Sequence, residues 1–213
     1  MPPSTILRVG LTGNIAAGKS TVSCWLAELG CHLIDADELG HRCMEPGQPA
    51  HDEVIRTFGE KIVTPGGDID RRHLGRLVFS DDAARARLEA ILHPCIRHLE
   101  EEEAARWRDA VETGIVVTEA ALLYEAGSAK RYHRVVVVVA PDELRLARLE
   151  AEGLTPEEAR QRLQAQMDQQ RKADAADYVI DNAGELAATR AQVETLSEKL
   201  HQDLAALQSG HAG

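Results

Sequence analysis

The chain of 213 residues is long enough to bury one sizeable core, so we expect a single domain with small appended lobes. Its formal net charge of −11 argues against broad binding to nucleic acid or to an anionic membrane, because both require clustered Lys and Arg side chains. Aromatic residues make up only 3 % of the chain, which also disfavours a surface that stacks the bases of single-stranded nucleic acid.

Five short apolar segments, separated by helical sequence, are the predicted strands. They cover residues 6–12, 32–34, 115–118, 135–140 and 178–180. The valines from Val135 to Val139 form a continuous apolar run, which is typical of a strand covered on both faces in a parallel sheet. The alternation of strands and helices predicts an α/β fold with a five-stranded parallel sheet flanked by helices.

The first strand leads into a glycine-bounded loop that fits the pattern G-x-x-x-x-G-K-[ST]. In such a loop, backbone N–H groups and the N-terminus of the next helix bind phosphate oxygens. Lys19 then reaches the β- and γ-phosphates, and the Ser20 hydroxyl binds Mg²⁺. Residues 20–29 predict that helix, and Gly30 is placed to end it. The predicted nucleotide site comprises Gly13, Asn14, Ile15, Ala16, Ala17, Gly18, Lys19, Ser20 and Thr21.

The second strand is followed by two acids, Asp35 and Asp37. Ligands of open parallel sheets bind at the carboxyl edge, where these carboxylates are expected to lie. There they are able to accept a proton from an attacking hydroxyl and to hold Mg²⁺ through water. The alternative is that one of them only caps the following helix. Beside a phosphate-binding loop, the functional interpretation is favoured.

A long insert of about residues 39–113 separates the second and third strands. It is mostly helical in pattern and is too long for a simple crossover, so we expect it to form a lobe of its own. Within it, His93 precedes Pro94. A lone histidine in such a helical region is more often a structural residue than a ligand.

The last third of the chain predicts three helices. Residues 143–150 and 156–172 form two that join at Gly153, and residues 185–207 form a terminal helix with leucines at helical spacing. Residues 208–213 are expected to be disordered. Basic residues gather on the first two helices: Arg145, Arg148, Arg160, Arg162, Arg171 and Lys172. Solvated helix faces and i,i+4 pairs explain most of them, which leaves one or two to close over a bound triphosphate.

The four cysteines, at positions 24, 31, 43 and 95, lack the Cys-x-x-Cys spacing of metal or redox sites. No signal peptide and no apolar run of about 18 residues is recognisable. We therefore expect a cytoplasmic protein without a membrane partner, in which the cysteines serve as ordinary apolar packing residues.

Together these motifs resemble the dephospho-coenzyme A kinase family. The resemblance covers about residues 8–193 and depends on the order and spacing of short segments, since no single motif after the loop is strong. The segments are GLTGNIAAGKST, LGCHLIDADELGHR, PGQPA, FGEKI, GDIDRRHLGRLVF, LEAILHP, LLYE, QAQM and KADAADYVIDNAG.

The resemblance implies that the chain, with Mg²⁺, transfers the γ-phosphoryl group of ATP to the ribose 3′-hydroxyl of dephospho-CoA, the final step of coenzyme A synthesis. It implies a P-loop kinase with a core of residues 5–38, 114–142 and 174–207. A helical substrate lobe of about residues 39–113 and a helical lid of about residues 143–173 complete it. The implied partners are the two small-molecule substrates, and the chain is expected to be a monomer or a small homo-oligomer.

The resemblance also implies roles for individual residues. Asp37 matches the general base, and Asp35 matches the acid before it, with roles in binding substrate and Mg²⁺. The remaining matches are Arg71, His93 and Glu125 for the substrate site, and Asn182 and Gly184 for the loop against the adenine of ATP.

The chain departs from the family pattern in its loop and in its lid. Asn14, Ala16 and Ala17 replace two glycines and a serine, all at positions that the loop pattern leaves open. Glu152 stands where the family tends to carry a lid arginine. A guanidinium is needed over the transferring phosphoryl group. Arg162 matches the family's basic residue four before Gln166 and is therefore predicted to supply it, with Arg148 or Lys172 as the alternatives.

Two other functions fit parts of the sequence. Another small-molecule P-loop kinase, such as a shikimate or nucleoside kinase, shares the loop and an early acidic pair, but does not need a lobe built around LEAILHP. A nucleotide-dependent switch calls for a clear strand-end Asp for Mg²⁺ or an Asn-Lys-x-Asp guanine motif, and neither appears in the sequence.

Overall fold

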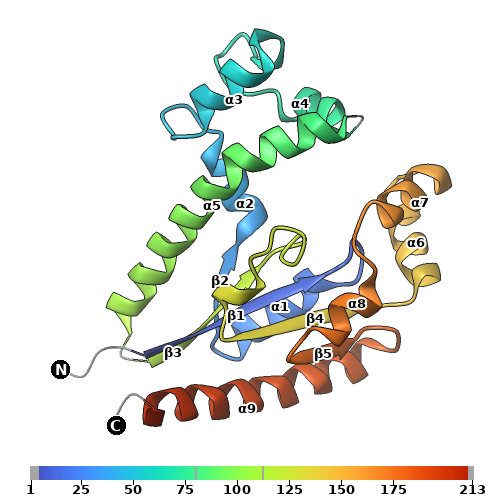
Figure 1. Cartoon of the computed structure of the whole chain (residues 1–213). Coiled ribbons are helices and arrows are strands. Elements are labelled where there is room, and N and C mark those ends of the chain that lie inside the picture. Colours follow the sequence, from blue (N-terminus) through green and yellow to red (C-terminus); the bar gives the residue numbers. More distant parts are fainter. Residues whose placement is uncertain (1–4, 80, 112, 211–213) are drawn as a thin grey trace. The chain divides into compact units, whose positions relative to one another are not determined.

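The computed structural model describes residues 5–79, 81–111 and 113–210. These residues form a sheet of five parallel strands in the order β2-β3-β1-β4-β5 (Figure 1). The strands are β1 (Thr5–Gly13), β2 (His32–Asp35), β3 (Thr113–Glu119), β4 (Arg134–Val139) and β5 (Tyr178–Asp181). The five predicted strands and the α/β fold with its parallel sheet are confirmed.

Strand β1 lies at the centre of the sheet, between β3 and β4. Apolar side chains of β1 and β4 form one core with α1 (Lys19–Glu28) and α9 (Leu186–Gly210) on one face of the sheet. Val136 and Val138 belong to this core, whereas Val135 and Val137 pack into a second cluster with Leu123. The continuous valine run is therefore buried on both sides, which explains why it does not alternate with polar residues.

Helix α9 is attached to the sheet by polar contacts as well as by apolar packing. The Asp203 carboxylate accepts hydrogen bonds from Nε and Nη2 of Arg134, at 2.9 and 2.7 Å, and from the Tyr178 hydroxyl at 2.8 Å. At the outer strand β5, the Gln192 side chain pairs with both the N–H and the carbonyl of Asp181. Such pairing blunts part of an edge strand that a second chain would otherwise be able to extend.

The structure corrects two predictions near the C-terminus. The single helix predicted for residues 156–172 is two helices, α7 (Pro156–Gln164) and α8 (Gln169–Asp174), which follow α6 (Asp142–Ala151). The chain breaks between them because the Asp168 side chain accepts a bond from the Arg171 N–H and starts α8 anew. Helix α9 continues to Gly210, so disorder is wrong for residues 208–210, and residues 211–213 lie outside the described residues.

The chain divides into two compact units, one of residues 1–35 and 105–213 and the other of residues 36–104. The second unit contains α2 (Ala36–Cys43), α3 (His51–Phe58), the 3₁₀ turn η1 (Glu60–Ile62), α4 (Arg71–Phe79) and most of α5 (Asp82–Ala110). It has a core of its own, in which Val54, Ile62 and Leu74 are almost completely buried. The long insert is therefore helical, as predicted.

The cysteines are not all simple packing residues. Cys43 of α2 and Cys95 of α5 form a disulfide within the second unit, which corrects the expectation for this pair. Of the two free cysteines, Cys24 is exposed and Cys31 is buried. Burial raises the pKa of the Cys31 thiol to about 11, because the buried thiolate loses its hydration, so this thiol stays protonated at neutral pH.

In the described ranges, no helix combines the length and the apolar character that crossing a membrane requires.

The packing of α9 makes a prediction for stability. Leu200 is fully buried against the sheet, whereas Leu186 on the same helix is 62 % exposed. We expect Leu200→Ala to lower the free energy of unfolding by about 2–5 kcal/mol, because it leaves a cavity in the main core. The matched control, Leu186→Ala, should change it by about 0.5 kcal/mol or less. Chemical denaturation of both variants measures this, and equal losses would contradict the assigned packing.

Candidate active site

The glycine-bounded loop connects the end of β1 to the start of α1. Gly18 is the N-cap of α1 and has φ +98, a left-handed conformation that favours glycine. A Cβ at this position would collide with the Asn182 amide. At Gly13, a Cβ would collide with the Val138 carbonyl of the neighbouring strand. The two glycines of the pattern are therefore needed for close approach of the backbone to its surroundings.

The loop carbonyls are held by side chains from distant parts of the chain. The Asn182 amide donates to the Ala17 carbonyl at 2.8 Å, and Thr189 donates to Oδ1 of Asn182 at 3.0 Å. The Arg148 guanidinium donates to the Ala16 carbonyl at 2.8 Å. Ala16 has φ +58, an uncommon conformation for a residue with a side chain. These hydrogen bonds to the Ala16 and Ala17 carbonyls restrain the backbone conformation of the loop.

A cavity of about 400 Å³ opens beside this loop. Its lining combines the loop with α6 and with the segment after β5: Ala16, Gly18, Lys19, Ser20, Thr21, Arg148, Glu152, Asn182 and Leu186. Lys19 and the N-terminus of α1 thus face a space large enough for a small ligand with phosphate groups. Two residues are predicted for the adenine loop. Asn182 lines this cavity, whereas Gly184, two residues later in the chain, is not among its lining residues.

Acids gather at the carboxyl edge of the sheet, next to Ser20. Glu119 ends β3, and its carboxylate accepts from the Ser20 hydroxyl at 3.3 Å and from the Ser23 hydroxyl at 2.7 Å. Asp35 ends β2 and lies opposite Glu119 in the register of the two strands. Glu119 was not singled out in the sequence, although its place after an apolar strand run is a usable signal. A pattern that admits only Asp at the end of a strand does not include this glutamate.

Asp37, the predicted general base, lies near the position in the chain where the first unit ends and the second begins. Asp35 is the last residue of the first unit, and Asp37 lies in the first turn of α2, which begins the second unit. The Asp37 side chain is exposed. The two acids are therefore covalently linked through one residue, but they belong to different units.

The second unit contains a cavity of about 630 Å³. Arg71 lines it, and the Arg71 guanidinium lies 2.8 Å from Nε2 of His41, which lines it as well. Its other lining residues are Met44, Ile69, Asp70, Arg72, Leu74, Gly75 and Leu88. His93 sits half-buried in the middle of α5 and does not line this cavity. The structure therefore brings Arg71 together with His41.

Glu125, predicted for the substrate site, lies in the first unit. Its carboxylate forms an ion pair of 2.8 Å with Lys172 of α8, whose side chain is completely buried, and accepts from the Met167 N–H at 3.2 Å. A buried ammonium needs such a partner, since an unpaired charge in the core is costly. These contacts place Glu125 at the junction of α7 and α8.

Arg162 and Arg148 differ in their surroundings. Arg162 lies in the last turn of α7 and is exposed, which leaves its guanidinium accessible from solvent. Arg148 is partly buried and donates to the carbonyls of Ala16 in the loop and of Asn182 after β5, so its position is already fixed by the protein.

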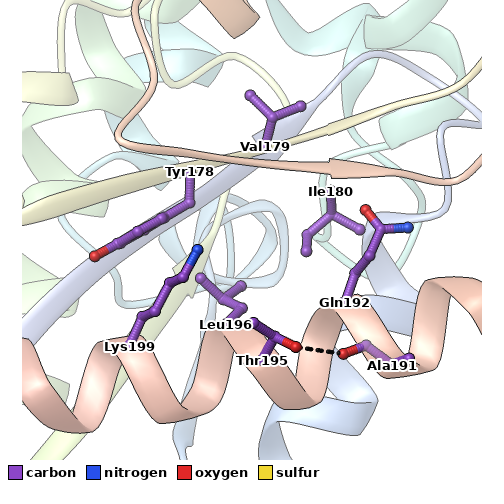
Figure 2. A pocket seen from close by; sticks show the side chains of 8 residues that line it. All are labelled: Tyr178, Val179, Ile180, Ala191, Gln192, Thr195, Leu196 and Lys199. Atoms are coloured by element: carbon purple, nitrogen blue, oxygen red, sulfur yellow. Dashed lines mark hydrogen bonds between the residues drawn. The ribbon is translucent and has the colours of Figure 1, made fainter.

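A separate cavity of about 300 Å³ lies between β5 and α9 (Figure 2). The sticks in Figure 2 show Tyr178 and Ile180 pointing from the strand toward the helix that carries Leu196 and Lys199, whereas Val179 points to the other side of the strand. None of the residues predicted for catalysis or binding lines it, so the cavity beside the glycine loop is the better nucleotide site.

Comparison with known proteins agrees with this geometry. The family model described as dephospho-CoA kinase matches residues 7–188. A protein named dephospho-CoA kinase from Symbiobacterium thermophilum is 46 % identical over 192 residues, which cover 87 % of this chain and 78 % of that protein. Among solved structures, TT1252 from Thermus thermophilus has a TM-score of 0.78 at 38 % identity, with 92 % of this chain and 98 % of that chain covered. Dephospho-CoA kinase from Campylobacter jejuni has a TM-score of 0.68 at 28 % identity, with 93 % and 98 % covered.

Proposed function

The chain belongs to the dephospho-CoA kinase family, and we propose that it transfers the γ-phosphoryl group of ATP to the ribose 3′-hydroxyl of dephospho-CoA. The products are coenzyme A and ADP. The observation that carries this proposal is the family match over most of the chain, and the loop geometry supports the ATP half of the reaction. The same match favours this reaction over the alternative of a shikimate or nucleoside kinase.

The donor is proposed to bind along the glycine loop. Loop N–H groups and the N-terminus of α1 supply partners for phosphate oxygens, and the Lys19 ammonium balances charge on the β- and γ-phosphates. The adenosine end then extends toward Asn182 and Gly184, along the cavity that Asn182 and Leu186 line. A phosphate chain held this way presents its terminal phosphorus in one orientation, which accounts for much of the rate of phosphoryl transfer.

The acceptor is proposed to bind to the second unit, with Arg71 pairing with a phosphate of dephospho-CoA. Arg71 lines the cavity of about 630 Å³, which suits part of a long substrate. His93 and Glu125 are also proposed to support the acceptor, His93 from α5 and Glu125 from the α7–α8 junction. Asp37 then accepts the proton of the attacking 3′-hydroxyl as the general base.

The residues near Ser20 fit a Mg²⁺ ion that is shared with phosphate. The described residues hold no cluster of three His, Cys, Asp or Glu side chains suited to a metal. Mg²⁺, however, is usually held by one or two carboxylates, water and substrate phosphates. The Ser20 hydroxyl, the Glu119 carboxylate and Asp35 supply such a set at one edge of the sheet. When bound, Mg²⁺ would neutralise charge on the phosphates, while Ser20 and Asp35 hold it and Glu119 orients Ser20.

The lid is proposed to bring Arg162 over the transferring phosphoryl group. A guanidinium stabilises the negative charge that spreads over the equatorial oxygens in the transition state. Arg162 is exposed on α7 and therefore suits this role better than Arg148, which is bonded to the loop. Cytoplasmic location and assembly as a monomer or small homo-oligomer stay predictions.

A coupled assay tests the proposed reaction. With ATP and Mg²⁺, dephospho-CoA should be converted to coenzyme A, identified by mass, because the second unit binds a long acceptor. Shikimate and free nucleosides should be about a hundredfold poorer in kcat/KM, since they lack the parts that this unit would bind. A preference for either control acceptor would assign the chain to the alternative reaction.

The role of Asp37 makes a kinetic prediction. Asp37→Asn should lower kcat by about 10² or more with smaller changes in either KM, because the amide cannot accept the hydroxyl proton. Asp35→Asn, the matched control two residues before it, should mainly increase the Mg²⁺ requirement. Steady-state kinetics over a range of Mg²⁺ concentrations separate the two, and the reverse pattern would exchange their roles.

Glu119 makes a prediction about the metal. Glu119→Gln should raise the Mg²⁺ concentration for half-maximal activity about 10- to 100-fold, since outer partners of a metal ligand typically affect affinity by this much. Ser23→Ala is the control, because Ser23 donates to the other carboxylate oxygen and is not a proposed ligand. A Glu119→Gln enzyme with an unchanged Mg²⁺ requirement would remove Glu119 from the metal site.

A further inference from the structure

The segment between α7 and α8 is bonded to the glycine loop by two hydrogen bonds. The Asn14 amide donates through Nδ2 to the Met167 carbonyl at 2.9 Å. The Ile15 N–H of the loop donates to Oε1 of Gln166 at 2.7 Å. Two consecutive loop residues thus donate hydrogen bonds to two consecutive residues of the short connection between α7 and α8. We call this connection, residues 165–168, the lid hinge.

The other side of the lid hinge is fixed to the body of the first unit. The Met167 N–H donates to Glu125, and Glu125 is paired with the buried Lys172 of α8. On α8, the Gln169 side chain accepts from the Ala140 N–H at 3.2 Å. The hinge is therefore held between the loop and α8, and α7 directly precedes it along the chain.

The contacts of the lid hinge with the glycine loop and with Glu125 are hydrogen bonds. A cavity of about 330 Å³ lies against it, lined by Asn14 and Arg145 together with Leu163, Gln164, Gln166, Met167, Asp168 and neighbouring residues. Asn14 itself is only 2 % exposed, so its amide donor has little access to water if the bond to Met167 breaks.

We propose that Asn14 and Gln166 are positioning residues that tie the lid hinge to the phosphate loop and thereby set where α7 carries Arg162. Arg162 lies four residues before Gln166, one helical turn away, so a shift of the hinge moves its guanidinium. The inference rests on the proposed function for its catalytic consequence. The structural part, restraint of α7 by the loop, does not depend on it.

This role is specific to a side chain at position 14. Glycine has no side-chain amide to donate to Met167. Asn14→Gly therefore removes the bond and introduces a residue that loops of this pattern accept. Gln166→Met removes the second bond at similar side-chain length.

The first measurement is amide hydrogen exchange of the ligand-free protein. In Asn14→Gly and in Gln166→Met, amides of α7 should exchange about tenfold faster, because the hinge opens more often. Gln170→Ala is the control, since Gln170 lies on α8 beside the same cavity and bonds only Asp174 among the contacts described. Unchanged exchange in α7 of both hinge variants would overturn the inference, whatever the enzyme's substrate proves to be.

The second measurement compares the rate of ATP hydrolysis without acceptor with the rate of phosphoryl transfer. A loosened lid admits water, so the ratio of acceptor-independent ATP hydrolysis to transfer should rise about tenfold in Asn14→Gly. The double variant should be no worse than the worse single variant, because both act through one hinge. Multiplying effects, or loss of ATP binding alone, would assign Asn14 to the loop and not to the lid. Absence of transfer to dephospho-CoA by the unmutated enzyme would instead refute the proposed function.

Discussion

The phosphate loop depends on partners for its carbonyl groups. A loop whose N–H groups serve a ligand still has carbonyl oxygens, and buried carbonyls need donors. Here the donors are Arg148 for Ala16 and Asn182 for Ala17, which lie 132 and 165 residues further along the chain. The loop is therefore a tertiary structure, although its sequence pattern is local. Helix α6 and the end of β5 must be in place before the loop has its shape.

The residues of the proposed metal site and the proposed general base also come from separate parts of the chain. The edge of the sheet gathers Ser20, Glu119 and Asp35 because three neighbouring strands end there. The proposed base, Asp37, follows two residues later but belongs to the second unit. The proposed roles are therefore divided between the two units.

The disulfide in the second unit bears on its internal order. Cys43 and Cys95 join α2, which carries Asp37, to α5. A cross-link of this kind restricts the unfolded chain and ties the two helices at one point. The second unit also has its own apolar core, so its helices do not rely on the bond alone.

The amino-acid sequence alone determined the features that arise from neighbouring residues. Strand burial and tight turns have local signals. The parallel sheet was predicted from the valine run of β4 and the other short apolar segments, and the loop from the glycines at positions 13 and 18. Residue order and spacing were also enough to indicate the family. These features need no knowledge of what packs against them.

Tertiary structure decided the features that join distant residues. Glu119 is one of 35 acidic residues, and only the register of β2, β3 and β1 brings it to Ser20. Helix propensity favoured one helix over residues 156–172, yet bonds from Asn14 and Ile15 hold the break between α7 and α8. The pairing of Cys43 with Cys95, 52 residues apart, likewise has no local signal. A hydrogen bond or a disulfide depends on distances of a few ångströms, and only the folded backbone sets those distances.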